Sequence, residues 1–259
     1  MKKITTLLLT FIVGTVMVAP TSMATEVTMP EDQEDYQCGL WEDVPESYLE
    51  VITDVCERGL MYGYDEYTFG FGDDALRVGA AALSSRIADG EDQYYGVMGT
   101  TEATELKSRF YDMPVFTQDT YWIYTNVDRA TRVGTMRGDG TDYVTSFRPL
   151  DTINKVEIFK VLYEALRIGN ALGANVTDEN ISYYGGVWYE DLMNKMEDEG
   201  VIYDLDLDDE YFVVSTGGIT KSFRGFDDQI RREDAALIIH SMIEHGLADE
   251  TSLQRQLGL

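Results

Sequence analysis

The sequence predicts a mainly α-helical protein built from three helix–loop–helix repeats. Similar residues recur at two nearly equal spacings, because Arg77, Lys155 and Arg232 stand 78 and 77 residues apart. Within each segment, apolar residues recur at the three- and four-residue spacing of a buried helix face, and a glycine closes the first helix. With 44% hydrophobic and 12% aromatic residues, the chain can bury a core.

The first repeat is predicted over 38–90. It opens at Trp41-Glu42-Asp43-Val44-Pro45, where acidic residues favour the positive end of the helix that follows. That helix is expected to end near Gly59, and a loop holding Phe69 leads to an alanine-rich second helix that starts at Arg77. The first helix has an apolar stripe at helical spacing, formed by Tyr48, Ile52 and Val55.

The second repeat is predicted over 111–169. It is expected to open at Phe116-Thr117-Gln118-Asp119 and to close its first helix at Gly134. The loop Phe147-Arg148-Pro149 precedes a second helix that starts at Lys155. The apolar stripes of the two helices consist of Ile123, Val127 and Ala130, and of Val156, Phe159, Leu162, Tyr163 and Leu166.

The third repeat is predicted over 185–248. It opens at Trp188-Tyr189-Glu190-Asp191, closes its first helix at Gly200 and continues through the loop Phe223-Arg224-Gly225. Its second helix is expected to start at Arg232. The apolar stripe of that helix consists of Ala235, Ile238, Ile239, Met242 and Ile243, which is the pattern of core packing.

The N-terminus has the three parts of a secretory signal peptide. A basic start at Met1-Lys2-Lys3 precedes the apolar run Leu7–Val18 and the small residues of Ser22-Met23-Ala24. The run is shorter than the roughly 20 residues that a membrane-spanning helix needs. We expect residues 1–24 to be removed on export, leaving no transmembrane segment; the alternative is an uncleaved N-terminal anchor. Export predicts a location in the cell wall, at the cell surface or outside the cell.

The remaining segments are predicted to be linkers. They are the acidic segment 25–37, the connectors 91–110 and 170–184, and the C-terminal tail 249–259. Inside the third repeat, the alternating residues Tyr211–Val214 predict a short extended pair between the two helices.

The acidic charge of the chain excludes two classes of partner. Asp and Glu number 47 against 20 Lys and Arg, which gives a formal net charge of −27. Nucleic acids and anionic membrane surfaces repel such a protein. We therefore expect no nucleic-acid partner.

A pair of cysteines and an acidic run are candidates for a disulfide and a metal site. Cys38 and Cys56 lie 18 residues apart, and in an exported protein they are expected to form a disulfide; two unpaired thiols are the alternative. The acidic run holding Asp204, Asp206 and Asp208 offers a weak candidate calcium site, but it lacks the glycine and glutamate of an EF-hand loop. A solvated acidic loop is the alternative, so no metal or other cofactor is assigned.

No enzyme signature is found in the sequence. The carboxylates are so numerous that no pair of them points to glycoside hydrolysis. His240 and His245 are five residues apart, so a helix does not place them on one face as metal ligands. The chain also has no nucleophile-elbow, zinc-protease or phosphate-loop motif. We predict that it is not an enzyme.

The order of these residues resembles the S-layer homology motif. Trp41-Glu42-Asp43-Val44-Pro45 is similar to its opening, Phe147-Arg148-Pro149 to its central loop and Ile230-Arg231-Arg232-Glu233-Asp234 to the start of its second helix. The resemblance covers roughly 40–247. It implies a pseudo-threefold helical unit whose grooves bind cell-wall glycan, such as a pyruvylated secondary polymer linked to peptidoglycan.

Carried over residue by residue, the resemblance implies a set of glycan-binding residues. The anion-binding groups are the basic residues at the second helix starts, where a cation adds donors to the positive end of the helix. Aromatic residues of the openings and arginines of the loops complete the set. Its members are Arg77, Lys155, Arg232, Trp41, Trp188, Arg148 and Arg224.

Three departures from the motif leave alternatives open. Lys155 replaces an arginine, Gly79 stands where the motif has glutamate, and the third loop reads Phe223-Arg224-Gly225. One alternative is that the basic residues bind no glycan and form surface ion pairs with neighbouring acids. Under that alternative, the protein is a structural envelope or surface-layer component that contacts other proteins or calcium and binds no glycan.

Overall fold

The computed structural model describes residues 37–89, 98–139, 145–171 and 189–246. The predicted signal peptide 1–24, nearly all of the linker 25–37 and the tail 249–259 lie outside these residues. Trp188 and most of the connector 170–184 do so as well. Among the described residues, no helix is both long enough and apolar enough to cross a bilayer.

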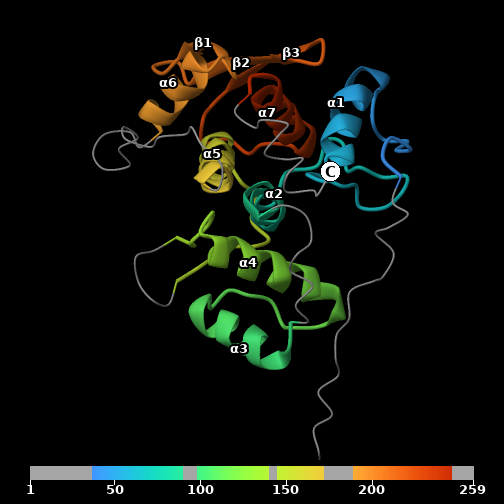
Figure 1. The fold of residues 1–259 in the computed structure, drawn as a ribbon, viewed down its shortest axis with the longest axis vertical. Helices are drawn as coiled ribbons and strands as arrows, with labels where there is room; N and C mark the ends of the chain where they lie inside the picture. The colour runs from blue at the N-terminus through green and yellow to red at the C-terminus, as the bar shows by residue number, and fades with distance from the viewer. Residues whose placement is uncertain (1–36, 90–97, 140–144, 172–188, 247–259) are drawn as a thin grey trace, which may run out of the picture.

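Seven α-helices make up about half of the described residues. Each repeat contributes two, and the second helix of each begins at its basic residue. The six are α1 (Glu46–Glu57), α2 (Arg77–Asp89), α4 (Tyr121–Val133), α5 (Lys155–Ala171), α6 (Glu190–Asp198) and α7 (Arg232–Glu244). Gly134, directly after α4, has φ 94°, the left-handed conformation that ends a helix and that glycine adopts without strain. Figure 1 shows α2 and α5 at the centre, with α4 below them and α7 above.

The prediction of a mainly α fold is wrong, because the third repeat contains a three-stranded antiparallel sheet. Its strands are β1 (Tyr203–Asp206), β2 (Tyr211–Thr216) and β3 (Ile219–Arg224), in the order β1-β2-β3. Every second side chain of β2 is buried, and the sheet packs on α7. Gly217 and Gly218 form the two-residue turn between β2 and β3, both with positive φ. The fold is therefore mixed α and β, and the extended pair expected at 211–214 is confirmed as part of β2.

The segment 91–110 is more than a connector, since it contains α3 (Thr100–Arg109). Phe110, directly after α3, packs edge-to-face on Phe147 at 5.3 Å between ring centroids. Trp41 packs on Phe69 in the same way at 5.3 Å. The second repeat therefore opens at Phe110 rather than at Phe116, which precedes the 3₁₀ turn η2 (Gln118–Thr120).

The three repeats meet in a closed ring of backbone hydrogen bonds. The N–H of Ala75 donates to the carbonyl of Ile230 at 2.8 Å, and the N–H of Ile230 donates to Ile153 at 3.1 Å. The N–H of Ile153 completes the ring by donating to Ala75 at 2.9 Å. The ring lies two residues before each basic helix start, so it fixes how each of those residues faces the next repeat.

A disulfide joins Cys38 to Cys56 and fastens the opening segment to α1. Trp41 is only 4% exposed and packs in a small apolar cluster with Phe69 and Ile52. This cluster fixes the loop that faces Arg232.

Candidate functional site: three joints between repeats

Each basic helix start forms a joint with the loop of the next repeat. The main-chain N–H groups of the three residues donate to carbonyls of the neighbouring segment at 2.9 to 3.1 Å. The acceptors are Asp151 for Arg77, Asp228 for Lys155 and Asp73 for Arg232. We name the three places the Arg77, Lys155 and Arg232 joints.

The side chains continue the same cycle. Arg77 Nε donates to the Phe147 carbonyl at 2.9 Å, and Arg232 Nε donates to the Phe69 carbonyl at 3.1 Å. Lys155 Nζ donates to the Gly225 carbonyl at 3.0 Å. All three predicted anion-binding residues are thus also used to hold neighbouring repeats together. A cation that holds a buried carbonyl contributes to stability, because removing it leaves that acceptor unsatisfied.

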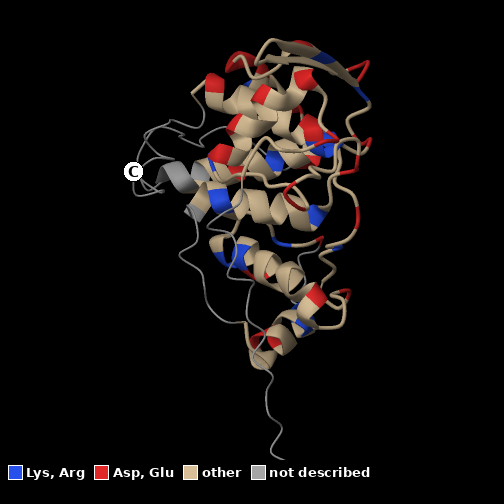
Figure 2. Ribbon diagram, turned by 90° about the vertical axis from the view of Figure 1, so that its right-hand side faces the viewer, with Lys and Arg blue, Asp and Glu red and all other residues tan. Residues whose placement is uncertain are grey.

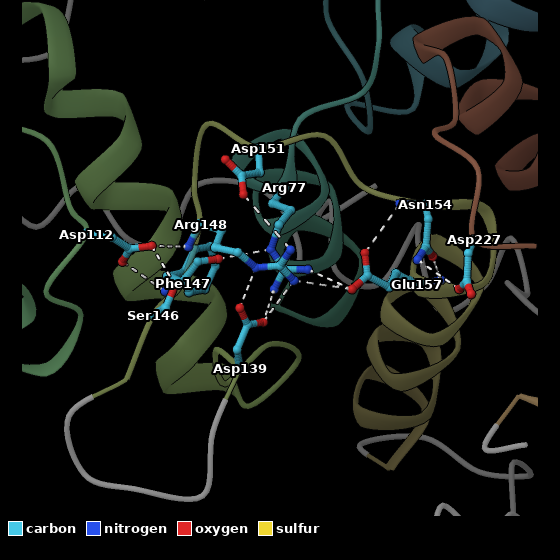
Figure 3. Close-up of polar contacts among 10 residues, drawn as sticks. All are labelled: Arg77, Asp112, Asp139, Ser146, Phe147, Arg148, Asp151, Asn154, Glu157 and Asp227. Carbon is cyan, nitrogen blue, oxygen red and sulfur yellow. Dashed lines mark hydrogen bonds and ion pairs between the residues drawn. The ribbon is translucent and has the colours of Figure 1, made fainter. Parts of the chain in front are cut away.

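The Arg77 joint is filled by carboxylates of the protein itself (Figure 3). Arg77 is 6% exposed and also contacts Glu157 at 3.2 Å and Asp139 at 3.5 Å. Arg148 forms a bidentate pair with Asp139 and lies 3.6 Å from Glu157. The hydrogen bond from Arg148 to Asp139 raises the pKa of Arg148 against the opposing effect of burial. The two guanidinium groups therefore already have anionic partners.

Arg148 occupies a strained backbone position. Its φ is 56°, whereas the same place in the other two repeats holds Gly70 at 86° and Gly225 at 67°. In all three, the carbonyl accepts a hydrogen bond from an N–H three residues later. Arg148 is therefore equivalent to Gly225, and the predicted match with Arg224 is off by one residue. Arg224 lies on β3 over the Tyr211 ring, at 5.1 Å from its centroid, and the described contacts do not bring it into a joint.

The Lys155 joint buries its cation. Lys155 is 8% exposed, and its Nζ lies 3.7 Å from Asp228 Oδ2. Burial lowers the pKa of Lys155, while the nearby Asp228 and Asp234 raise it. A compact ammonium in this place lacks the fork of donors that an arginine presents to a ligand carboxylate.

The Arg232 joint combines a half-buried cation with exposed aromatic surface. Arg232 NH2 donates to the Tyr62 carbonyl at 2.8 Å. Its guanidinium lies over the Tyr64 ring at 4.5 Å and over the Phe69 ring at 5.0 Å. Tyr64 is 57% exposed and Tyr67 is 55% exposed. Burial raises the pKa of Tyr64 despite the opposing charge of Arg232, so its hydroxyl stays protonated at neutral pH.

Two aspartates fix the loops that the cations reach. Asp43 accepts the N–H groups of Phe69, Gly70 and Phe71 at 2.7 to 2.8 Å. Asp112 accepts the equivalent N–H groups of the second loop at 2.6 and 3.0 Å. Burial acts to raise the pKa of each carboxyl, but the hydrogen bonds lower it overall. The loops therefore present their carbonyls in a fixed orientation.

Comparison with models of known protein families gives no match, and comparison with curated protein sequences gives none either. The resemblance to the S-layer homology motif thus rests on the residues of this chain alone.

The calcium candidates do not come together as a metal site. Asp206 instead accepts the N–H groups of Asp208 and Asp209, both at 3.0 Å, and so caps the turn after β1. Over the part of the chain that the structure describes, no three His, Cys, Asp or Glu residues are arranged to hold a metal ion.

Several residues of the joints were missed in the sequence. Asp139 and Glu157 fill the Arg77 joint, and Tyr62 and Tyr64 form part of the Arg232 joint. The run of tyrosines before Phe69 was a usable signal, because exposed aromatics next to a cation favour ligand contact. No pattern in the sequence distinguishes Asp139 from the many other acids. Trp41, by contrast, is placed in the core rather than at a binding surface.

Proposed function

We propose that this chain is a non-catalytic cell-envelope attachment protein that binds an acidic cell-wall glycan at a joint between repeats. The observation that carries the proposal is the Arg232 joint, where a half-buried guanidinium lies beside a tyrosine ring with more than half of its surface exposed. An arginine at a helix start provides donors for a carboxylate, and an aromatic face provides an apolar surface for a sugar ring.

The charge of the protein favours a local rather than a general mode of binding. Asp and Glu positions are spread over the helices and loops, with fewer basic positions between them (Figure 2). A net charge of −27 repels a polyanion at long range, so attraction has to come from contacts at short range. At physiological salt, charges separated by more than about 8 Å are largely screened, which reduces that repulsion.

Co-sedimentation with purified cell-wall sacculi tests the proposal. The chain without residues 1–24 is mixed with sacculi that retain their non-peptidoglycan polymers, and with sacculi stripped of them. We expect pelleting with the first and none with the second. Arg232→Gln is expected to lower pelleting, whereas Arg132→Gln removes an exposed cation that pairs within α4 and serves as the matched control.

Absence of pelleting with unstripped sacculi would favour a structural envelope component with protein partners. The two joints with buried cations support that alternative, because their contacts stabilise the fold without any ligand. If the wild-type chain stays in the supernatant with unstripped sacculi, with and without added calcium, glycan attachment is refuted.

A further inference from the structure

The three-stranded sheet of the third repeat has two edges, and the β1 edge is protected against strand addition. β1 is short, and a bulge interrupts its pairing with β2 between Tyr203 and Asp206. Asp204 has a positive φ of 52°, and the N–H of Leu205 donates to the Glu197 carboxylate at 3.0 Å. Short, irregular and charged edges prevent a further strand from pairing. The pairing of β3 with β2, by contrast, is regular over the whole of β3.

The hydrogen bonds between β2 and β3 show which main-chain groups point away from the sheet. The N–H of Gly225, directly after β3, donates to the Glu210 carbonyl at 2.9 Å. Hydrogen-bonded pairs alternate along an antiparallel ladder, so every second residue of β3, counted back from Gly225, also points its N–H and C=O groups toward β2. The residues between them point theirs to the outer edge, and they are Thr220, Ser222 and Arg224.

These outward main-chain groups have no partner within the described part of the chain. No hydrogen bond joins an N–H or C=O group of Thr220, Ser222 or Arg224 to another described residue. All three residues are exposed, and Figure 1 places the β2–β3 hairpin at the upper rim of the molecule. One regular strand edge therefore offers the donors and acceptors that an extended peptide needs to add to a sheet.

Contacts of the hairpin hold this edge in place before any strand is added. The turn at Gly217 packs directly on α1, because a Cβ added there would clash with Val51. The hydroxyls of Ser215 and Thr220 link the two strands across their exposed face at 2.9 Å. A partner strand therefore meets an ordered edge, which lowers the entropic cost of binding.

The side chains of β3 favour an acidic partner. The strand contains Lys221 and Arg224 but no acid, although Asp and Glu number 47 in the whole chain. Lys221 pairs with Asp234 of α7. Arg224 lies over the Tyr211 ring and forms no ion pair with any described acid. An acid opposite Arg224 on an added strand gains a cross-strand ion pair, whereas two β3 strands from two copies would bring like charges together at one seam.

We propose that the outer edge of β3 binds an extended, acidic strand of a partner protein, which adds to the sheet as a fourth strand. Its main chain pairs with the outward groups, and its alternate side chains lie on the two faces of the sheet. On the exposed face they meet Thr220, Ser222 and Arg224. On the inner face they lie beside Ile219 and Phe223, so the segment that fits alternates acidic with apolar residues. The edge gives the chain a protein partner independently of glycan binding.

Binding of a strand-length peptide tests the proposal. The probe is a fluorescent peptide in which glutamate and valine alternate, and a peptide with glutamine in place of glutamate is its control. Each is titrated by fluorescence polarisation against the chain without residues 1–24 at 0.15 M salt, which limits long-range repulsion. We expect the glutamate peptide to bind more tightly, and Arg224→Gln to remove the difference. No binding at about 1 mM, or tighter binding of the glutamine peptide, overturns the proposal.

Substitutions at Ser222 separate the main chain from the side chain. Ser222→Pro removes the central outward N–H and places the proline ring in the path of the partner strand, while the bonds to β2 stay. Ser222→Ala keeps the N–H and is the matched control. We expect Ser222→Pro to bind the glutamate peptide about tenfold more weakly than Ser222→Ala, because a lost hydrogen bond has an effect of this size. Equal binding by the two overturns the proposal.

Two measurements do not depend on the peptide affinity of a variant. Amide hydrogen exchange of the unaltered chain should slow at Ser222 and Arg224 when the glutamate peptide is added, because their N–H groups become hydrogen-bonded; unchanged exchange at both overturns the proposal. Sedimentation of the chain alone should be the same for wild type and Ser222→Pro. A dimer that Ser222→Pro dissociates would show that the edge pairs with a second copy, which also overturns it.

Discussion

Replacing Asp43 by alanine should destabilise the protein more than replacing any neighbouring acid by alanine. The Asp43 carboxylate accepts the N–H groups of Phe69, Gly70 and Phe71 at 2.8, 2.7 and 2.7 Å. Hydrogen bonds to a charged group contribute about 1.5–3 kcal/mol each when the partner is left unsatisfied. Asp43 is only half-buried, so water replaces part of this, and we expect a loss of about 3 kcal/mol in the free energy of unfolding.

Urea unfolding at pH 7 measures this loss, with Glu42→Ala as the matched control. Glu42 is exposed and adjacent, so its removal changes the net charge equally and is expected to cost less than about 0.5 kcal/mol. If Asp43→Ala destabilises the protein no more than Glu42→Ala does, the carboxylate does not hold the Phe69 loop and the reasoning is refuted.

The contribution of Asp43 should also disappear in acid. Burial acts to raise the pKa of Asp43, but the three N–H bonds outweigh it and lower the pKa overall. A group with a lowered folded pKa contributes stability that is complete above its unfolded pKa of about 3.9 and is lost as the pH falls through the folded value. Melting curves from pH 6 to pH 2 should therefore show wild type and Asp43→Ala converging below about pH 4. A constant difference would contradict this.

Three further predictions concern stability. Reduction of the Cys38–Cys56 disulfide should lower the free energy of unfolding by about 3 kcal/mol, measured by urea titration with and without dithiothreitol. Gly79→Ala should raise the melting temperature, because alanine is favoured over glycine in a helix by about 0.5–1 kcal/mol and a Cβ at position 79 meets no atom within 4 Å. A lower melting temperature would contradict the absence of a neighbour at this Cβ. The free energy of unfolding of Arg148→Gly should exceed that of Arg148→Ala by about 1 kcal/mol. Both variants lose the ion pair with Asp139, but only glycine removes the strain of the left-handed backbone conformation. Equal stability of the two would contradict this.

Local signals in the sequence were enough to find the helices of the repeats. In the second repeat, the apolar stripe before Gly134 matches α4, and the stripe that follows Lys155 matches α5. These signals succeed because amphipathic spacing and a terminal glycine act within a few residues of the chain. The alternating residues from Tyr211 likewise predicted an extended segment, now β2.

Features that depend on contacts between distant residues were not predictable. The acidic turn between β1 and β2 gave no sign that Tyr203–Asp206 pairs with β2. Phe110 and Phe116 both precede acids, and only the packing of Phe110 on Phe147 identifies the opening of the second repeat. The basic helix starts were found correctly as elements, but the partners of their side chains come from the next repeat, 70 to 163 residues away.

Hydrogen–deuterium exchange of the complete chain with solubilised wall polymer tests the central claim most directly. The chain without residues 1–24 is compared with and without polymer, using peptides that report each joint separately. The account predicts slower exchange confined to the Tyr62–Asp73 loop and the start of α7, the two sides of the Arg232 joint. Protection at the Arg77 joint instead, or no protection anywhere, would contradict it.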